Sequence, residues 1–332
     1  MDKNSEELNM FSFFKFWHKK NNTFQKDLQE NDSPDLVLEV PENWNFYMCQ
    51  IDEVPASYFL NLALAKIAPI TNRSTLLWVE IKMNSSREDG LSSSEEFEHL
   101  AQIEDQIIPA LTSKLAILYV GRLTHNHLRD FYFYCEDGID PEYIINKVMQ
   151  FYPEYSYRFG QKLDSDWSTY FNYMYPSKEI MQTISNRSVI ENLQNHGDNL
   201  EVARNIDHWI YFKNEVDLHK FVEIILSWDF QINQKNKIEE NDGFRYQLQI
   251  CKTEFVDQQS IDYCTLQLSQ LANQLNGEYD GWETLVIKNL TEKPNPQHTE
   301  LDFMLETTIW LDGRRILTSW TIFPIFVQYA VP

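Results

Sequence analysis

The second half of this 332-residue chain alternates strand-like and helix-like segments in one particular order, and that order limits the folds open to it. Period-two alternation of apolar residues predicts strands, whereas apolar residues three and four positions apart predict helices. The predicted order is strand, helix, strand, strand, helix, strand, over residues 205–212, 216–228, 230–237, 244–251, 258–275 and 279–287. This β-α-β-β-α-β succession indicates a ferredoxin-like fold of the α+β class.

The first half also mixes the two patterns. Strands are predicted at 44–51, 75–83, 115–123, 129–136 and 155–159, and helices after Pro55, Ser94 and Pro141. The helix after Pro55 is inferred from apolar residues on one face, at Phe59, Leu62, Ala63 and Ile67. We expect an α+β sandwich in which helices cover one face of a mainly antiparallel sheet.

Polar and proline-containing stretches divide the chain into four parts. We expect a flexible leader over 1–33, an α+β domain over 34–176, a ferredoxin-like domain over 177–288, and a linker with a C-terminal β-hairpin over 289–332. The hairpin is predicted from alternating residues on both sides of the turn at Asp312-Gly313. The leader holds one short aromatic cluster, Met10 to Trp17, too short for a secretory signal, and we expect no stable membrane association.

Acidic residues outnumber basic residues in both halves, and the formal net charge is −22. Such a charge repels phosphate backbones and favours basic protein surfaces, so we expect no direct nucleic-acid binding. The alternative is that the acidity only keeps an aromatic-rich protein in solution. The four cysteines have no close pairing pattern, which is typical of a reduced, cytoplasmic protein.

Only 9 residues are glycine, and three of them lie in two patches rich in aromatic and acidic residues. Gly197 lies in the sequence H-G-D-N-L, and Gly277 and Gly281 lie in G-E-Y-D-G-W-E-T. Glycine is used where the backbone needs a positive φ or a close approach, so these three residues are expected to be structural. Trp and Tyr beside carboxylates are residue types that anchor protein interfaces.

These two motifs, with the strand R-N-I-D-H-W-I-Y-F at 204–212, resemble the regulator of RNase E activity B family over roughly residues 186–287. The resemblance implies a non-enzymatic bacterial protein that binds and restrains an RNase E-type endoribonuclease. The first half, with W-x-F-Y, Y-V-G-R-x-T and R-D-F-Y-F-Y, is similar to an uncharacterised domain family that occurs fused to such regulators. That second likeness implies no activity.

A protein partner, an RNase E-type ribonuclease or another basic protein, is therefore expected to bind the second domain. The strand alternation places Asp207, Trp209 and Tyr211 on the sheet face opposite the helices, and His208 on the core side as a structural residue. The candidate partner-binding residues are Asp198, Arg204, Asp207, Trp209, Tyr211, Glu278, Tyr279, Asp280, Trp282 and Glu283. The alternative is that another part of the chain covers this face, and that the carboxylates around Gly281 only stabilise a turn.

A hydrolase or transferase site in the first domain is the alternative function. It would use Glu104 or Asp105 with Arg122 and Arg129, in a cleft where one carboxyl group has a strongly raised pKa. The same four residues are also compatible with a structural ion network. Nucleotide-binding, zinc-protease and hydrolase-elbow motifs are absent, so we expect no cofactor. His125 and His127 have no further Cys or His at ligand spacing, so we expect no metal site.

Overall fold

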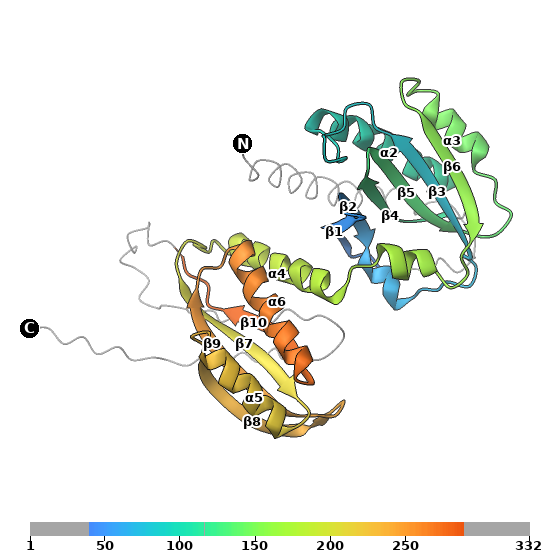
Figure 1. Ribbon diagram of the computed structural model, residues 1–332. Coiled ribbons are helices and arrows are strands. Elements are labelled where there is room, and N and C mark those ends of the chain that lie inside the picture. Colours follow the sequence, from blue (N-terminus) through green and yellow to red (C-terminus); the bar gives the residue numbers. More distant parts are fainter. Residues whose placement is uncertain (1–39, 116, 289–332) are drawn as a thin grey trace, which may run out of the picture. The chain divides into compact units, whose positions relative to one another are not determined.

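The computed structural model describes residues 40–115 and 117–288, which form two compact units (Figure 1). The first unit ends at Tyr175 and the second begins at Pro176. Each unit has its own sheet and its own buried core. The chain is therefore of the α+β class with two domains, as the sequence predicts. The expected leader over 1–33 and the expected hairpin over 289–332 lie outside the described residues.

The first unit is built on a six-stranded antiparallel sheet of order β1-β2-β4-β5-β3-β6. The helices α2 (Ser94–Lys114) and α3 (Glu142–Met149) pack on one face of it. Two short helical segments, η1 (Leu62–Lys66) and η2 (Thr169–Met174), complete the unit. The strands are β1 (Trp44–Ile51), β2 (Val54–Asn61), β3 (Thr75–Lys82), β4 (Ile117–His125), β5 (Leu128–Cys135) and β6 (Tyr157–Leu163).

Helix α2 begins where the sequence provides a cap. The Ser93 hydroxyl accepts a hydrogen bond from the Glu96 backbone N–H at 3.2 Å, which satisfies one of the free amide groups at the start of the helix. The apolar side chains of Leu100, Ile103 and Ile107 follow at helical spacing and are fully buried against the sheet. Local capping and apolar periodicity thus agree, and they fix which face of the sheet α2 covers.

The prediction of a helix after Pro55 is wrong. The chain continues as strand β2 and forms only the single turn η1 at Leu62–Lys66. Ala56 and the residues from Tyr58 to Asn61 are all buried, because both faces of β2 are covered. A strand buried on both faces carries apolar residues at consecutive positions, and such a run also satisfies helical spacing.

The second unit has the predicted ferredoxin-like succession. Its antiparallel sheet has the order β10-β7-β9-β8, so the four strands lie in the order 4-1-3-2. Helix α4 (Lys178–Asn195) precedes this succession and packs on α6 and the sheet through Ile190 and Leu193. The other elements are β7 (Arg204–Phe212), α5 (Glu215–Leu226), β8 (Gln231–Asn241), β9 (Phe244–Glu254), α6 (Gln258–Gln274) and β10 (Gly277–Thr284).

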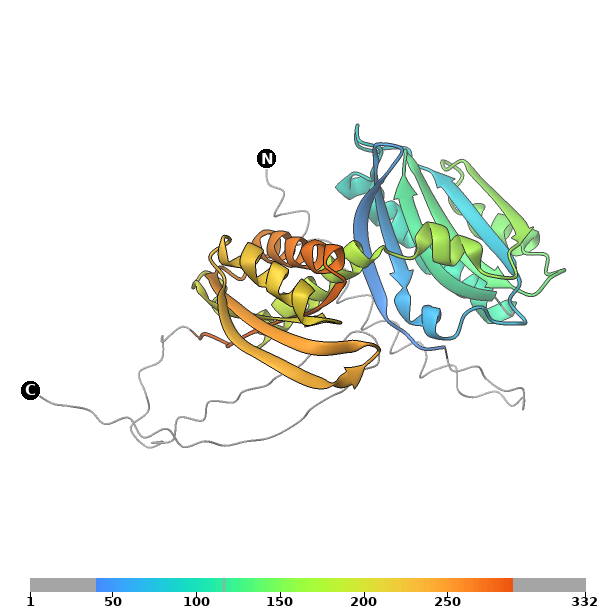
Figure 2. The same ribbon diagram turned by 60° about the horizontal axis from the view of Figure 1, so that its bottom comes forward.

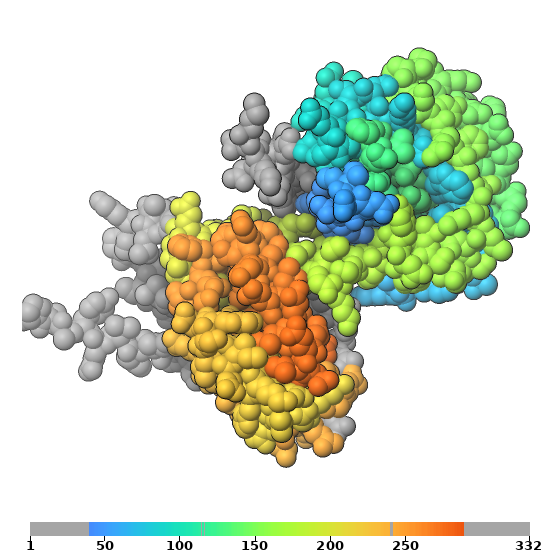
Figure 3. Space-filling model, viewed as in Figure 1, coloured from blue at the N-terminus to red at the C-terminus, as the bar shows by residue number. Residues whose placement is uncertain are grey.

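The helices α5 and α6 lie on the same side of this sheet (Figure 2), and α4 packs on α6. Seen from the helix side, the side chains of α5 and α6 form a continuous surface (Figure 3). The core beneath them includes Ile210, Phe212, Phe221, Leu248 and Leu268, each fully buried. The opposite sheet face is thus the one that α5 and α6 leave uncovered.

Candidate functional site

The uncovered sheet face of the second unit, called the open face below, carries two aromatic side chains at its centre. Asp207, Trp209 and Tyr211 of β7 are half-buried, while the residues between them point into the core. This is the alternation predicted from the sequence. Strand pairing puts Glu283, Gly281 and Glu278 of β10 beside these three residues on one flank, and Cys251, Gln249 and Gln247 of β9 on the other.

Hydrogen bonds hold the polar side chains of the open face in place. The amide of Gln247 donates to the Tyr211 hydroxyl at 2.8 Å, and Asn236 of β8 donates to Gln247 at 3.4 Å. The Asp207 carboxylate accepts hydrogen bonds from Asn233 and, at 3.4 Å, from Gln249. Because each side chain is fixed by a neighbour, less conformational entropy would be lost when a partner binds.

The β10 edge of the open face is acidic. Glu278 and Asp280 are exposed and Glu283 is half-buried. Burial, together with the charge of neighbouring Asp207, raises the pKa of Glu283, and burial also raises the pKa of Asp207. Neither Asp207 nor Glu283 forms an ion pair with any residue that the structure describes. The edge can therefore receive an arginine or lysine of a partner.

Tyr279 and Trp282 were predicted to bind a partner, but their side chains are buried in the unit. The Tyr279 hydroxyl lies 2.9 Å from Nδ1 of His208, and the Trp282 indole N–H donates to Asn186 of α4 at 2.9 Å. A β-bulge between Tyr279 and Gly281 shifts the register and turns both rings to the core side. Neither ring is available to a partner.

His208 lies on the core side, where the sequence predicted it. Complete burial and then the nearby charge of Lys252 lower the pKa of His208 to about 3, so the imidazole is neutral at physiological pH. Its Nε2 lies 3.8 Å from the Cys264 thiol. These contacts are those of a packed structural residue.

Asp198 and Arg204 form a buried ion pair, which is a second departure from the predicted partner-binding set. The Asp198 side chain is fully buried and that of Arg204 is 4% exposed. Arg204 contacts the carboxylate through both terminal nitrogens, at 2.5 and 2.7 Å. The Ile287 backbone N–H also donates to Asp198 at 2.7 Å. The pair therefore ties the segment after β10 to the loop before β7.

The three glycines of the sequence motifs differ in their local conformation and surroundings. Gly197 follows α4 with a φ of +78°, the left-handed conformation common after a helix. A Cβ on Gly277 would lie 2.6 Å from the Phe212 ring, so a side chain there would displace the core. Gly281 has a φ of +151° beside the bulge, and a Cβ there would meet no atom within 4 Å. Next to Trp209, no described residue therefore lies over the backbone at Gly281.

The four residues proposed for an enzyme site in the first unit do not form an open site. Glu104 and Arg122 form an ion pair buried between α2 and the sheet, and the Tyr119 hydroxyl donates to Glu104 at 3.2 Å. Arg129 is also buried, and burial followed by the charge of Arg122 lowers its pKa to about 9. Asp105 is exposed on the outer side of α2. The structural ion network is the interpretation that fits these positions.

His125 and His127 lie at the turn between β4 and β5, and each is within hydrogen-bond distance of another group. His127 Nδ1 lies 2.7 Å from the Ser86 hydroxyl, and His125 Nδ1 lies 3.1 Å from the Pro55 carbonyl. Within residues 40–115 and 117–288, no group of three or more potential ligand side chains could hold a metal ion. The helices in those ranges are also too short or too polar to cross a membrane.

The first unit contains a groove that no sequence pattern indicated. It lies on the sheet face opposite α2 and α3, and Asp130 and Lys162 are among the side chains that line it. Its residues come from β3, β5, β6 and η2, and no motif connects them. The one available signal was an acidic residue, Asp130, at alternate spacing with Leu128 and Tyr132 of the same strand.

Comparison with known proteins agrees with the fold of the second unit, an antiparallel ferredoxin-like α+β domain. Residues 183–284 match the family model described as regulator of ribonuclease activity B. Residues 42–175 match the model described as a family of unknown function, DUF695. The chain thus carries regions similar to both families in the order that the sequence motifs indicated.

Two further comparisons add little. No curated protein sequence matches the chain. Among solved structures, the crystal structure of a candidate glycine cleavage system transcriptional repressor matches with 8% sequence identity and a TM-score of 0.20. That match covers 65% of this chain and 98% of the other. A likeness at this level contributes nothing to the assignment of function.

Proposed function

We propose that the second unit is a non-enzymatic regulatory domain that binds a protein partner through its open face, and that the partner is a ribonuclease of the RNase E type. The observation that carries the proposal is the pair of half-buried rings, Trp209 and Tyr211, on a sheet face that neither α5 nor α6 covers. The match of residues 183–284 to a family of ribonuclease regulators supports the identity of the partner.

The chemistry of the open face suits a basic protein surface. Trp and Tyr contribute large contact areas with few rotatable bonds, which makes them frequent anchors of interfaces. The carboxylates of Glu278, Asp280 and Glu283 at the β10 edge would attract arginine and lysine side chains. Attraction between exposed charges mainly raises the association rate and weakens with salt, because salt screens it.

Cleavage of RNA by a purified RNase E-type endoribonuclease, with increasing amounts of the full chain, tests the proposal. We expect the cleavage rate to fall as the chain binds, and the binding to weaken between low and high salt. Trp209→Ala combined with Asp280→Asn should weaken binding by at least 2 kcal/mol, roughly thirtyfold, while the domain stays folded.

A matched control changes an aromatic and an acidic residue on the helix side. Tyr263 of α6 and Glu223 of α5 are both exposed, so Tyr263→Ala with Glu223→Gln should leave the affinity unchanged. Equal affinity of the Trp209/Asp280 variant and the unmodified chain would rule out the open face as the binding surface. No binding at any salt concentration would exclude this ribonuclease as the partner.

A further inference from the structure

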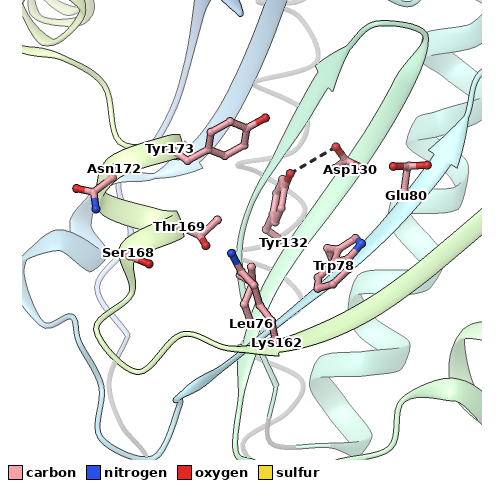
Figure 4. A pocket seen from close by; sticks show the side chains of 10 residues that line it. All are labelled: Leu76, Trp78, Glu80, Asp130, Tyr132, Lys162, Ser168, Thr169, Asn172 and Tyr173. Atoms are coloured by element: carbon pink, nitrogen blue, oxygen red, sulfur yellow. Dashed lines mark hydrogen bonds between the residues drawn. The ribbon is translucent and has the colours of Figure 1, made fainter.

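The groove of the first unit has the size and the composition of a small-molecule site. Its volume is about 540 Å³, within the range of roughly 300–1,000 Å³ that is usual for ligand pockets. Figure 4 shows the sheet residues on one side of the groove and residues of η2 on the other. The lining residues are Leu76, Trp78, Glu80, Asp130, Tyr132, Lys162, Ser168, Thr169, Asn172 and Tyr173.

The η2 wall of the groove is fixed to the sheet. The Asp164 carboxylate accepts hydrogen bonds from the backbone N–H groups of Ser168 and Thr169, both at 3.0 Å. It also accepts one from the Tyr134 hydroxyl at 2.5 Å, and the Tyr134 ring stacks on Trp167 at 3.9 Å. Burial alone would raise the pKa of Asp164, but hydrogen bonds from the Ser168 hydroxyl, the Tyr134 hydroxyl and Thr169 lower it to about 2. The wall is therefore in place before any ligand binds.

The positions of the aromatic rings are also set by their neighbours. Trp78 lies over Gly160 of β6, where an added Cβ would be only 2.4 Å from the indole ring. Tyr173 of η2 packs edge-on against Tyr58, whose hydroxyl donates to the Tyr173 carbonyl at 3.0 Å. Together with Tyr132, these rings supply π faces, which attract cations.

Asp130 gives one end of the groove an uncompensated carboxyl group. Its Oδ2 accepts only a long hydrogen bond from Tyr132, at 3.4 Å, and its buried Oδ1 has no partner among the described residues. The neighbouring Glu80 is already paired with Arg158 through both carboxylate oxygens. Burial, and then the charge of Glu80, raise the pKa of Asp130 to about 7. A bound cation would restore the balance of charge at this end.

At the other end of the groove, the positively charged Lys162 forms no ion pair with any described residue. Lys162 pairs with Leu76 across the sheet, whereas Asp130 pairs with Glu80, four residues farther along β3. Four residues of a strand span roughly 13 Å, which is too far for Lys162 and Asp130 to neutralise each other. In Figure 4 the Lys162 ammonium points from β6 toward η2, where Thr169 and Tyr173 face the groove. An anionic group of a ligand could bind here.

We propose that this groove binds a small zwitterionic molecule, with a guanidinium or ammonium group at Asp130 and a carboxylate at Lys162. An amino acid with a cationic side chain has this chemistry. A planar guanidinium would stack on the aromatic rings and donate to the Oδ2 of Asp130, because the Oδ1 is buried. The proposal concerns the first unit alone and is independent of ribonuclease binding by the second unit.

Isothermal titration calorimetry on the full chain, with three probes, tests this inference. L-Arginine carries both charged ends, agmatine lacks the carboxylate, and L-norvaline lacks the guanidinium. We expect L-arginine to bind, and each of the other two to bind at least tenfold more weakly, because each loses a charge-assisted interaction. No heat of binding with L-arginine up to about 10 mM overturns the proposal. Equal affinity for agmatine contradicts binding of the ligand carboxylate at Lys162. Equal affinity for L-norvaline contradicts binding of the cationic group at Asp130.

Two variants connect the binding to the groove. Asp130→Asn should weaken L-arginine binding at least tenfold, whereas Asp137→Asn, at an exposed position after β5, should not. If Asp130→Asn disturbs folding, Tyr173→Ala serves instead, because Tyr173 is 45% exposed and its truncation opens no core cavity. Unchanged affinity in a folded Asp130→Asn or Tyr173→Ala variant would show that L-arginine binds elsewhere, and so contradicts the proposal.

The protonation of Asp130 provides an independent readout. A bound guanidinium would lower the pKa of Asp130, so binding should release a proton near neutral pH and become tighter as the pH rises from 6 to 8. The charged and titratable groups around Asp130 are Glu80, Tyr132, Arg158 and Tyr173. A heat of binding that does not depend on the ionisation enthalpy of the buffer would contradict contact between ligand and Asp130.

Discussion

Each unit has a sheet with one face covered by helices, and the two opposite faces differ in shape. In the first unit the segment η2 stands against the sheet and creates a groove (Figure 4), whereas in the second unit α5 and α6 both lie on the face opposite the open face (Figure 2). The acidic side chains of the two faces also differ in their surroundings. Asp130 is inside the groove, while Glu278 and Asp280 are at an exposed edge. One short helical segment thus makes the difference between a groove and an open sheet face.

The largest expected effect tests whether the two units are independent. Asp198→Ala leaves the Arg204 guanidinium buried without its partner, which should destabilise the second unit by about 3–5 kcal/mol. Hydrogen exchange followed by mass spectrometry should show lost protection in β7 and β10 and unchanged protection in the first unit. Glu201→Ala, at an exposed position of the same loop, is the control. An equal loss of protection in the first unit would contradict independent folding.

An intermediate effect is expected at Asp130. Its pKa of about 7 in the folded unit is above the value of about 3.9 for an unfolded chain, so the unfolded state releases its proton at lower pH. Asp130 therefore lowers the stability of the first unit progressively as the pH rises from about 4 to about 7. Asp130→Asn should stabilise this unit by roughly 1–3 kcal/mol near pH 8 and change little near pH 4.

Urea unfolding of the first unit at both pH values measures this difference. The expected result is a stabilising substitution that weakens ligand binding, which is typical of a functional site built at the expense of stability. Destabilisation by Asp130→Asn at pH 8 would mean that the ionised carboxylate is well solvated in the groove. The carboxyl groups of the groove and of the open face would then not differ in their electrostatic surroundings.

The smallest effect is expected at Asp207 of the open face. Burial raises its pKa, but Asn233 and Gln249 donate hydrogen bonds to its Oδ1, which an asparagine can still accept. Asp207→Asn should therefore change stability by less than about 0.5 kcal/mol at pH 7. Thermal unfolding would measure this change. A stabilisation as large as that expected for Asp130→Asn would show that the open face also holds a strained carboxyl group.

Most elements of the second unit could be predicted because each strand has one buried face and each helix has one apolar stripe. The exception within the site is β10, where simple alternation does not apply. Tyr279 and Trp282 are three positions apart, yet both point to the core, because the bulge at Asp280 adds one residue between them. Gly281 was expected from the sequence to be structural, but the register of β10 depends on its pairing with β7.

The groove of the first unit could not be predicted from the sequence. Its residues are spread from Leu76 to Tyr173 in the sequence. They lie close together in space only because of the strand order β5-β3-β6 and the position of η2. Local patterns do not specify such long-range pairing. The pairing of Glu104 with Arg122 was among those considered from the sequence, but its burial between α2 and the sheet depends on the same long-range packing.

The neutral, enclosed His208 makes the second unit sensitive to mildly acidic pH. In the unfolded chain a histidine takes up a proton below about pH 6.5, whereas His208 resists protonation down to a pH of about 3. Acidification therefore favours unfolding of the second unit over this interval, while protonation of Asp130 favours the folded first unit. A drop in pH would thus destabilise the second unit through His208 and stabilise the first unit through Asp130.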